Sequence, residues 1–208
     1  MRKKIRIIGA GRTDAGVHAL GQSANFFTNK KIINLKSFLN SVNFFLNRNS
    51  ISIIDIKKKN SNFHSRYSAK ERIYDYKITN RNSPLALYKN RTWLIKKKLD
   101  INLLKKGAKI LKGKHDFSTF RASSCTAKTA IRKINDIKVT RGNGIINIQF
   151  KSKSFLQKQV RSMVGCLKYL SCKEWDLKKF KKVLKSKNRQ QCAPPAPACG
   201  LFLTKVRY

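Results

Sequence analysis

A β-hairpin signal in the second half of the chain constrains the fold more than any other local pattern. Two segments rich in β-branched residues, Ile131–Thr140 and Ile145–Lys151, flank the turn sequence Arg141-Gly142-Asn143-Gly144. Asn-Gly between such segments is the strongest short-range signal for two antiparallel strands. Residues 72–79 alternate with period two and have the pattern of a further strand, with two tyrosines on the same face. The sequence therefore predicts a mainly antiparallel sheet.

Helical and strand patterns both recur along the rest of the chain. Apolar residues at helical spacing predict helices over Ile33–Leu46, Ile101–Leu111, Ser154–Leu170 with Ser154 as N-cap, and Trp175–Leu184. Short runs of strand-forming residues predict strands over Ile5–Ile8, Gln22–Phe27, Ile51–Ile56, Arg91–Ile95 and Leu201–Tyr208. This order predicts a mixed α+β fold. The turn-rich step from Asn82 to Pro84 suggests a boundary between an N-terminal lobe, residues 1–82, and a C-terminal lobe, residues 83–208.

The charge of the chain points to a polyanionic partner. Lys and Arg number 48 against 9 Asp and Glu, which gives a formal net charge of +39. Nucleic acid is the natural partner for so basic a surface. In the alternative interpretation, part of this charge reflects an AT-rich genome, which favours codons for Lys, Asn and Ile. Hydrophobic residues make up 41% of the chain, enough for a packed core.

Cysteine, histidine and apolar patterns indicate the compartment. The five cysteines are an odd number without a C-x-x-C pair, so they read as reduced thiols in a cytosol. The three histidines are far apart and lack zinc-type spacing, so no metal site is expected. The apolar run Ile5–Ile8 is too short for a secretory signal, and no segment has the apolar length of a membrane span. We therefore expect a cytoplasmic protein without a membrane partner.

Asp14 is the residue most suited to chemistry. It lies between Arg12-Thr13 and Ala15-Gly16, in a loop whose glycines permit tight turns and close approach of a ligand. Arg12 and the positive field of the chain favour the ionised carboxylate, which is ready to act as a nucleophile or a base. For an isolated Gly-x-x-Asp pattern, however, an aspartate that only stabilises a turn is the more common interpretation.

The longer sequence around Asp14 resembles a known active-site loop. Residues 9–19 read Gly-Ala-Gly-Arg-Thr-Asp-Ala-Gly-Val-His-Ala and are followed by Gln22 and Phe26. This segment resembles the active-site loop of the tRNA pseudouridine synthase A (TruA) family. Further segments resemble motifs of that family in the same order: Phe63–Ala69 with Arg72-x-Tyr74-x-Tyr76, His115–Arg121, Phe155 with Val160–Gly165, and Ala196–Leu203.

The resemblance implies roles for individual residues. It makes Asp14 the catalytic nucleophile, Tyr74 the ring that stacks on the target base, and Arg161 the basic partner of Asp14. Arg12 matches the arginine that helps to extrude the target nucleotide and holds RNA. Aromatic stacking, arginine pairing and extrusion of a base are each physically suited to such roles. Without the motifs, Tyr74 would be interpreted as sheet core and Arg161 as a solvated helix residue.

The histidines and remaining arginines of these motifs have weaker claims to chemistry. His18 is predicted to pack the loop rather than to act as a base. Four other residues are better candidates for holding the cleft or the RNA backbone: His64, Arg66, His115 and Arg121.

The resemblance also implies a fold and a reaction. The fold would be of the pseudouridine-synthase type, with two α/β lobes around a central basic cleft. The reaction would isomerise uridine to pseudouridine in the anticodon stem-loop of tRNA, at positions 38 to 40, and the enzyme would work as a homodimer. Because this isomerisation involves no redox change and no activated donor, no cofactor is expected. Whether Asp14 attacks the sugar or first abstracts a proton stays open.

The chain departs from the family pattern at its start. Family members begin with a strand, a loop bearing tyrosine and tryptophan, and a helix, whereas this chain begins almost at the aspartate loop. We therefore expect the N-terminal lobe to be truncated at its start and to expose an unpaired strand edge and an apolar face. This departure favours the alternative function, a catalytically inactive tRNA-binding or RNA-chaperone protein. A lesser departure is Ser162, which stands where the family has asparagine.

Overall fold

The computed structural model describes residues 4–208, and its centre is a mixed, mainly antiparallel sheet. In spatial order the strands are β2 (His18–Ala19), β9 (Leu201–Arg207), β4 (Glu71–Asn80), β8 (Ile145–Ser152), β7 (Ile131–Gly142) and β6 (Gly113–Asp116), and β5 (Trp93–Ile95) pairs with β4. The pairs β2–β9 and β4–β5 are parallel, and the others are antiparallel. The predicted α+β class is confirmed.

The predicted hairpin is formed by β7 and β8. The two strands pair from Gly142 opposite Ile145 at the turn to Ile134 opposite Ser152 at the far end. Asn143 and Gly144 form the turn, with positive φ angles of 49° and 73°. Two such residues in a two-residue loop match the twist of antiparallel strands. The hairpin prediction is therefore confirmed together with its turn.

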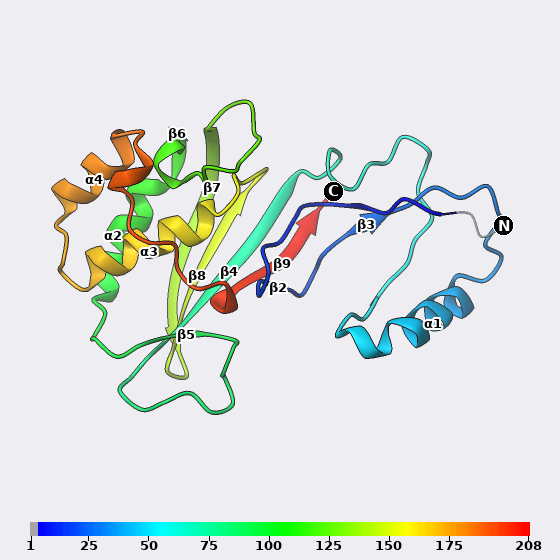
Figure 1. Ribbon diagram of the computed structural model, residues 1–208, viewed down its shortest axis with the longest axis horizontal. Coiled ribbons are helices and arrows are strands. Elements are labelled where there is room, and N and C mark those ends of the chain that lie inside the picture. Colours follow the sequence, from blue (N-terminus) through cyan, green and yellow to red (C-terminus); the bar gives the residue numbers. More distant parts are fainter. Residues whose placement is uncertain (1–3) are drawn as a thin grey trace.

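Three helices pack together beside the sheet: α2 (Ile101–Leu111), α3 (Gln159–Ser171) and α4 (Leu177–Lys185). They gather at one end of the molecule in Figure 1. α2 has the predicted bounds, and its N-cap Asp100 accepts hydrogen bonds from the backbone amides of the first turn. Gly107 allows α3 to approach α2, because a Cβ at this position would lie 2.6 Å from the Leu167 Cδ2 atom. The core lies between these helices and the strands β4, β7 and β8.

Helix α3 begins later than predicted. Its first residue is Gln159 and its N-cap is Lys158, so the prediction that Ser154 caps the helix is wrong. Ser154 lies in an irregular segment, where its carbonyl accepts a hydrogen bond from Ser152 Oγ at 2.8 Å. The Gln159 side chain accepts from the Leu156 amide, also at 2.8 Å. These side chains satisfy backbone groups that a helix would otherwise pair, so the helix starts after them.

The N-terminal part forms a second, smaller sheet and one helix. β1 (Ile8–Gly9) and β3 (Ala24–Asn25) pair antiparallel, and α1 (Leu35–Leu46) lies at the end of the molecule away from α2, α3 and α4 (Figure 1). No residue of α1 is buried. Large apolar side chains nearby are strongly exposed, among them Ile33, Phe44, Phe45 and Ile54. These exposed side chains lie on α1 and on irregular segments, and the exposed sheet edge and face expected from a truncated start stay a prediction.

The predicted strand over residues 51–56 is wrong. These residues are irregular, and the side chain of Asn43 on α1 takes the place of a neighbouring strand. Asn43 donates to the Ile53 carbonyl at 2.9 Å and accepts from the Ile53 amide at 2.8 Å. A single amide side chain thus satisfies both backbone groups of Ile53.

The division into lobes of residues 1–82 and 83–208 stays a prediction. β4 lies within the first range, yet it pairs with β8 and β9 from the second.

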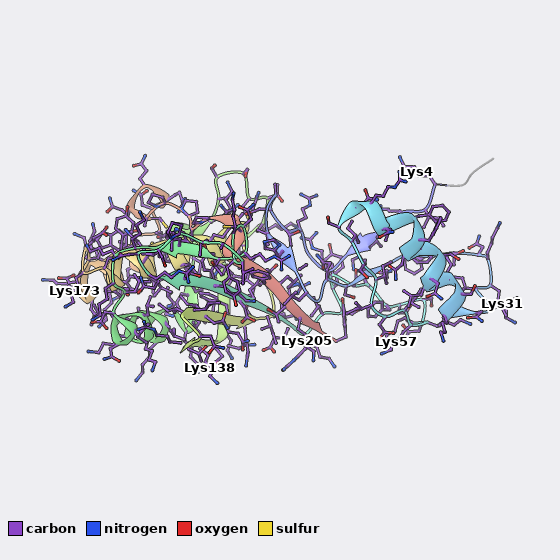
Figure 2. The ribbon with its side chains drawn as sticks, turned by 90° about the horizontal axis from the view of Figure 1, so that it is seen from below. Lys4, Lys31, Lys57, Lys138, Lys173 and Lys205 are labelled. Carbon is purple, nitrogen blue, oxygen red and sulfur yellow. The ribbon has the colours of Figure 1, made fainter. Side chains whose placement is uncertain are left out.

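Figure 2 shows lysines along the whole molecule, with Lys31 and Lys57 near α1 and Lys173 at the opposite end. Among residues 4–208, no helix has the length and apolar character to cross a bilayer.

Candidate active site

Asp14 occupies a tight turn between β1 and β2. The Val17 amide donates to the Asp14 carbonyl at 3.0 Å, which closes the turn. Gly16 has a φ of +78°, and a Cβ there would lie 3.4 Å from the Ala198 Cβ atom. A glycine is favoured at this position because side chains are strained at positive φ. The prediction that the loop glycines permit a tight turn is confirmed at Gly16.

The Asp14 carboxylate forms an ion pair with Arg161 of helix α3. The Arg161 Nη1 atom donates to Asp14 Oδ2 at 2.7 Å, and the two side chains are only 15% and 24% exposed. A charge-assisted hydrogen bond of this length holds the carboxylate in one orientation against the guanidinium. Within residues 4–208 the carboxylate accepts no hydrogen bond from the backbone of its own turn, so the turn-stabilising alternative is not supported. The alternative of Arg161 as a solvated helix residue is wrong.

A segment near the C-terminus, residues 193–200, fixes Arg161 from the other side, and we call it the strap. Ala196 in the strap accepts from Arg161 Nε at 2.8 Å, and its own amide donates to the Arg161 carbonyl at 2.9 Å. The strap crosses α3 at Gly165, where a Cβ would lie 2.1 Å from the Pro194 carbonyl oxygen. Tyr76 donates to the Pro197 carbonyl at 2.8 Å and anchors the strap to β4. Arg161 is therefore held by hydrogen bonds to both the strap and Asp14.

Tyr74 lies on the face of β4 that is directed toward this pair. Its side chain is buried, and its ring meets the half-buried ring of Phe155 edge to face at 5.3 Å between centroids. Burial raises the pKa of the Tyr74 phenol, the positive charge of Arg72 opposes this shift, and the negative charge of Asp14 adds to it. Tyr74 thus stays a neutral phenol. Its burial agrees with the alternative of a core residue as long as no ligand is bound.

Comparison with known proteins identifies the family. A sequence model of the family described as tRNA pseudouridine synthase matches residues 108–208. The chain is 58% identical to tRNA pseudouridine synthase A of Pelagibacter ubique over 208 residues, which are all of this chain and 85% of that protein. It is 41% identical to the protein of the same name from Neorickettsia sennetsu, again over the whole chain and 85% of the relative. The chain belongs to the tRNA pseudouridine synthase A family.

Arg12 is not part of the ion pair in this member of the tRNA pseudouridine synthase A family. Its side chain is exposed, and within residues 4–208 the only ion pair of Asp14 is the one with Arg161. The structure therefore brings together Asp14, Arg161 and Tyr74, while Arg12 remains on the surface of the loop. An exposed arginine next to the carboxylate is available to a polyanionic ligand.

The histidines of the tRNA pseudouridine synthase A motifs serve the local structure. His18 stacks on Phe202 at 4.7 Å between ring centroids, and its Nε2 atom is 2.8 Å from the Asn90 carbonyl oxygen. The prediction that His18 packs the loop is confirmed. His64 accepts from nearby backbone amides, and His115 is hydrogen-bonded to the Lys112 carbonyl.

Sequence reasoning assigned no role to two residues beside the site, Phe155 and Arg72. Phe155 forms the wall against which the Tyr74 ring packs. Arg72 is buried and donates hydrogen bonds to the Ala10 carbonyl, in the backbone of the loop that carries Asp14. The period-two pattern contained a signal for Arg72, because it placed this arginine on the same face as Tyr74, Tyr76 and Ile78, all of which are buried.

Proposed function

We propose that this protein isomerises uridine to pseudouridine in the anticodon stem-loop of tRNA, at positions 38 to 40, with Asp14 as the nucleophile. The observation that carries the proposal is the Asp14–Arg161 pair, a partly shielded carboxylate with its charge held at 2.7 Å by an oriented arginine. Membership of the tRNA pseudouridine synthase A family supports the substrate and the reaction.

The reaction breaks the bond between ribose C1′ and uracil N1 and forms a bond between C1′ and uracil C5. Its balance requires that the hydrogen on C5 leaves to solvent and that N1 takes up a proton, with no oxidant or activated donor. Asp14 suits the role of nucleophile because the hydrogen bond from Arg161, at 2.7 Å, fixes the orientation of its carboxylate. The surrounding residues limit access of water to the pair, which strengthens electrostatic interactions within it.

Tyr74 and Arg12 complete the proposed site. A uridine in a stem-loop must leave its stack before its C1′ atom can reach Asp14. We assign the Tyr74 ring as the surface on which the extruded uracil stacks, in place of part of its contact with Phe155. Arg12, exposed on the loop, is assigned to the phosphates beside the extruded nucleotide.

Binding of the whole tRNA is assigned to the basic surface, which would form a cleft between two lobes. The net charge of +39 supports strong, salt-dependent attraction to RNA phosphates. A homodimer that grips the elongated tRNA in the cytoplasm is part of the proposal. Light scattering of the purified protein tests it, and a mass of one chain alone, or of one chain plus one tRNA when tRNA is added, would remove the dimer from the proposal.

The function is tested by release of tritium from tRNA that carries 5-tritiated uridine. The wild-type protein is expected to release tritium, and Asp14→Asn is expected to release none above background. Asp136→Asn is the matched control, since Asp136 pairs with lysines on the outside of the sheet and is expected to leave the rate unchanged. Equal release by wild type and Asp14→Asn would reject the role of Asp14. Tight tRNA binding without release by the wild type would favour the inactive tRNA-binding alternative.

A further inference from the structure

We propose that Arg72 is a positioning residue, whose buried guanidinium fixes the spacing between the Asp14 loop and the wall of the site formed by Tyr74 and Phe155. This inference rests on the function proposed for Asp14 and Tyr74. It adds a residue that touches neither substrate nor reacting atoms in the proposed reaction.

Arg72 lies inside the molecule on β4 and is only 9% exposed. Its Nη2 and Nε atoms both donate to the Ala10 carbonyl, at 2.7 Å and 3.2 Å. Nη2 also donates to the Arg66 carbonyl at 2.7 Å, and Nη1 donates to the Lys153 carbonyl. One side chain thus connects three backbone segments that are distant in sequence.

Arg72 is buried without a counter-ion among residues 4–208, since every acceptor of its hydrogen bonds is a backbone carbonyl. Desolvation lowers the pKa of Arg72, which shows that burial disfavours its charge. Burying an unpaired charge is unfavourable, and an apolar residue at this position of β4 would avoid that cost. The hydrogen bonds therefore point to a geometric role, in which the planar fork of donors holds several segments at fixed separations.

The connected segments are those that carry the site. Ala10 begins the loop that leads to Asp14, and it is itself buried, with its amide donating to Ser23 at 2.7 Å. Lys153 precedes Phe155 on the chain, and Phe155 contacts Tyr74. Arg72 and Tyr74 lie on the same face of β4. A shift of the Arg72 guanidinium would therefore move the proposed nucleophile relative to the proposed stacking ring.

A second contact holds the same loop at a neighbouring point. The buried Ser65 hydroxyl donates to the Ile8 carbonyl at 2.6 Å, and the Ser65 amide donates to the Asn25 side chain at 2.9 Å. Ser65 fixes strands β1 and β3, whereas Arg72 connects the loop to Lys153, next to the Phe155 wall. Loss of Arg72 should therefore leave the sheet β1–β3 in place and affect the spacing across the site.

The test compares Arg72→Lys and Arg72→Ala with matched changes at Arg132. Arg132 is also partly buried, donates to backbone carbonyls at Thr129 and Ile131, and has its pKa lowered by desolvation, but it lies on β7. Lysine keeps the charge at position 72 but presents its donors from one point instead of a planar fork. We expect Arg72→Lys to reduce kcat by about 100-fold, as a displacement of about 1 Å in a reacting geometry would.

Three measurements distinguish a positioning role of Arg72 from an effect on the stability of the protein alone. For Arg72→Lys, we expect the KM for tRNA to stay near the wild-type value and the Tm to fall no further than in Arg132→Lys. Arg132→Lys should keep the wild-type kcat. For Arg72→Ala, added guanidinium ion at non-denaturing concentration should restore part of kcat, while guanidinium should not increase kcat in Arg132→Ala.

The inference is overturned by any of three results. These are a kcat of Arg72→Lys equal to that of the wild type, a loss of activity in parallel with Tm at both positions, and failure of both Arg72 variants to fold. The outcome is distinguishable from failure of the proposed function, because that function is rejected by an active Asp14→Asn protein. An inactive Asp14→Asn protein together with a fully active Arg72→Lys protein would reject the role of Arg72 alone.

Discussion

Arg161 and Asp14 are 147 residues apart in the sequence, yet their side chains meet at 2.7 Å between Nη1 and Oδ2. The pair joins helix α3 to the turn between β1 and β2, and the strap holds the same arginine through Ala196. Because both side chains are mostly shielded from water, salt screens this pair less than it screens a surface pair. The position of the proposed nucleophile therefore depends on the packing of α3 against the strap.

Arg161→Lys should reduce tritium release although the positive charge is kept. Lysine cannot donate at once to the Asp14 carboxylate and to the Ala196 carbonyl as the Nη1 and Nε atoms of arginine do. We expect kcat/KM to fall by about 10- to 100-fold through loss of orientation. Arg141→Lys, an exposed change near the turn of the hairpin, serves as the control. Normal turnover by Arg161→Lys would show that the orientation of Asp14 does not depend on the guanidinium.

Tyr74→Phe and Tyr74→Leu separate the ring from the hydroxyl. Burial raises the pKa of the Tyr74 phenol, so the substitution by phenylalanine removes no charge. Phenylalanine also keeps the aromatic ring and its packing on Phe155. Stacking of a base on an aromatic ring contributes about 1–3 kcal/mol, which corresponds to about 5- to 150-fold in rate or affinity. We expect Tyr74→Phe to retain most activity and Tyr74→Leu to lose it by that factor. Single-turnover kinetics measures both, and equal activity of the two variants would contradict a stacking role.

Gly165→Ala should displace the strap and with it Arg161. The new methyl group would lie 2.1 Å from the Pro194 carbonyl oxygen, so either the strap or α3 must move. Overpacking of this kind destabilises by about 1–3 kcal/mol. We expect a lower free energy of unfolding in urea together with reduced tritium release. In Gly142→Ala the Cβ meets nothing within 4 Å, so this variant should behave as wild type.

Local patterns were sufficient to predict elements whose backbone is satisfied within the element or its nearest neighbour. The turn of the β7–β8 hairpin is formed by adjacent residues that the sequence shows directly, and α2 has an apolar stripe and an aspartate at its N-cap. Both elements were therefore predicted closely. The predicted strand over residues 51–56 failed because the Asn43 side chain bonds to both backbone groups of Ile53. No local pattern reports such a contact.

The candidate site was predicted in part, for a similar reason. The motifs identified Asp14, Arg161 and Tyr74, which the fold brings together. Composition and spacing alone gave no basis for pairing Asp14 with Arg161 rather than with the adjacent Arg12. Arg12 is exposed on the loop, and the strap orients Arg161 toward Asp14. Both depend on tertiary packing.

The stability of the C-terminal part should contain a contribution from Asp116 that depends on pH. The Asp116 carboxylate accepts from the Ser118 hydroxyl at 2.6 Å and from the Ser118 amide at 2.9 Å. These hydrogen bonds, first that of the hydroxyl and then that of the amide, lower the pKa of Asp116, and the charge of Lys187 adds to the effect. The folded protein therefore binds a proton at Asp116 less readily than the unfolded chain does.

The sign of this pH dependence follows from the lowered pKa. The stabilisation is complete above the pKa of an unfolded aspartate, about 4, and is lost as the pH falls through the lower folded-state value. At pH 7 we expect Asp116→Ala to reduce the free energy of unfolding by about 1 kcal/mol, the usual net contribution of an intramolecular hydrogen bond. The difference from wild type should shrink as urea unfolding is repeated at pH values below 4, whereas Asp136→Ala, which removes only surface ion pairs, should have a small effect at pH 7. A difference for Asp116→Ala that stayed constant down to the acid limit would assign its effect to packing rather than to the charge of the carboxylate.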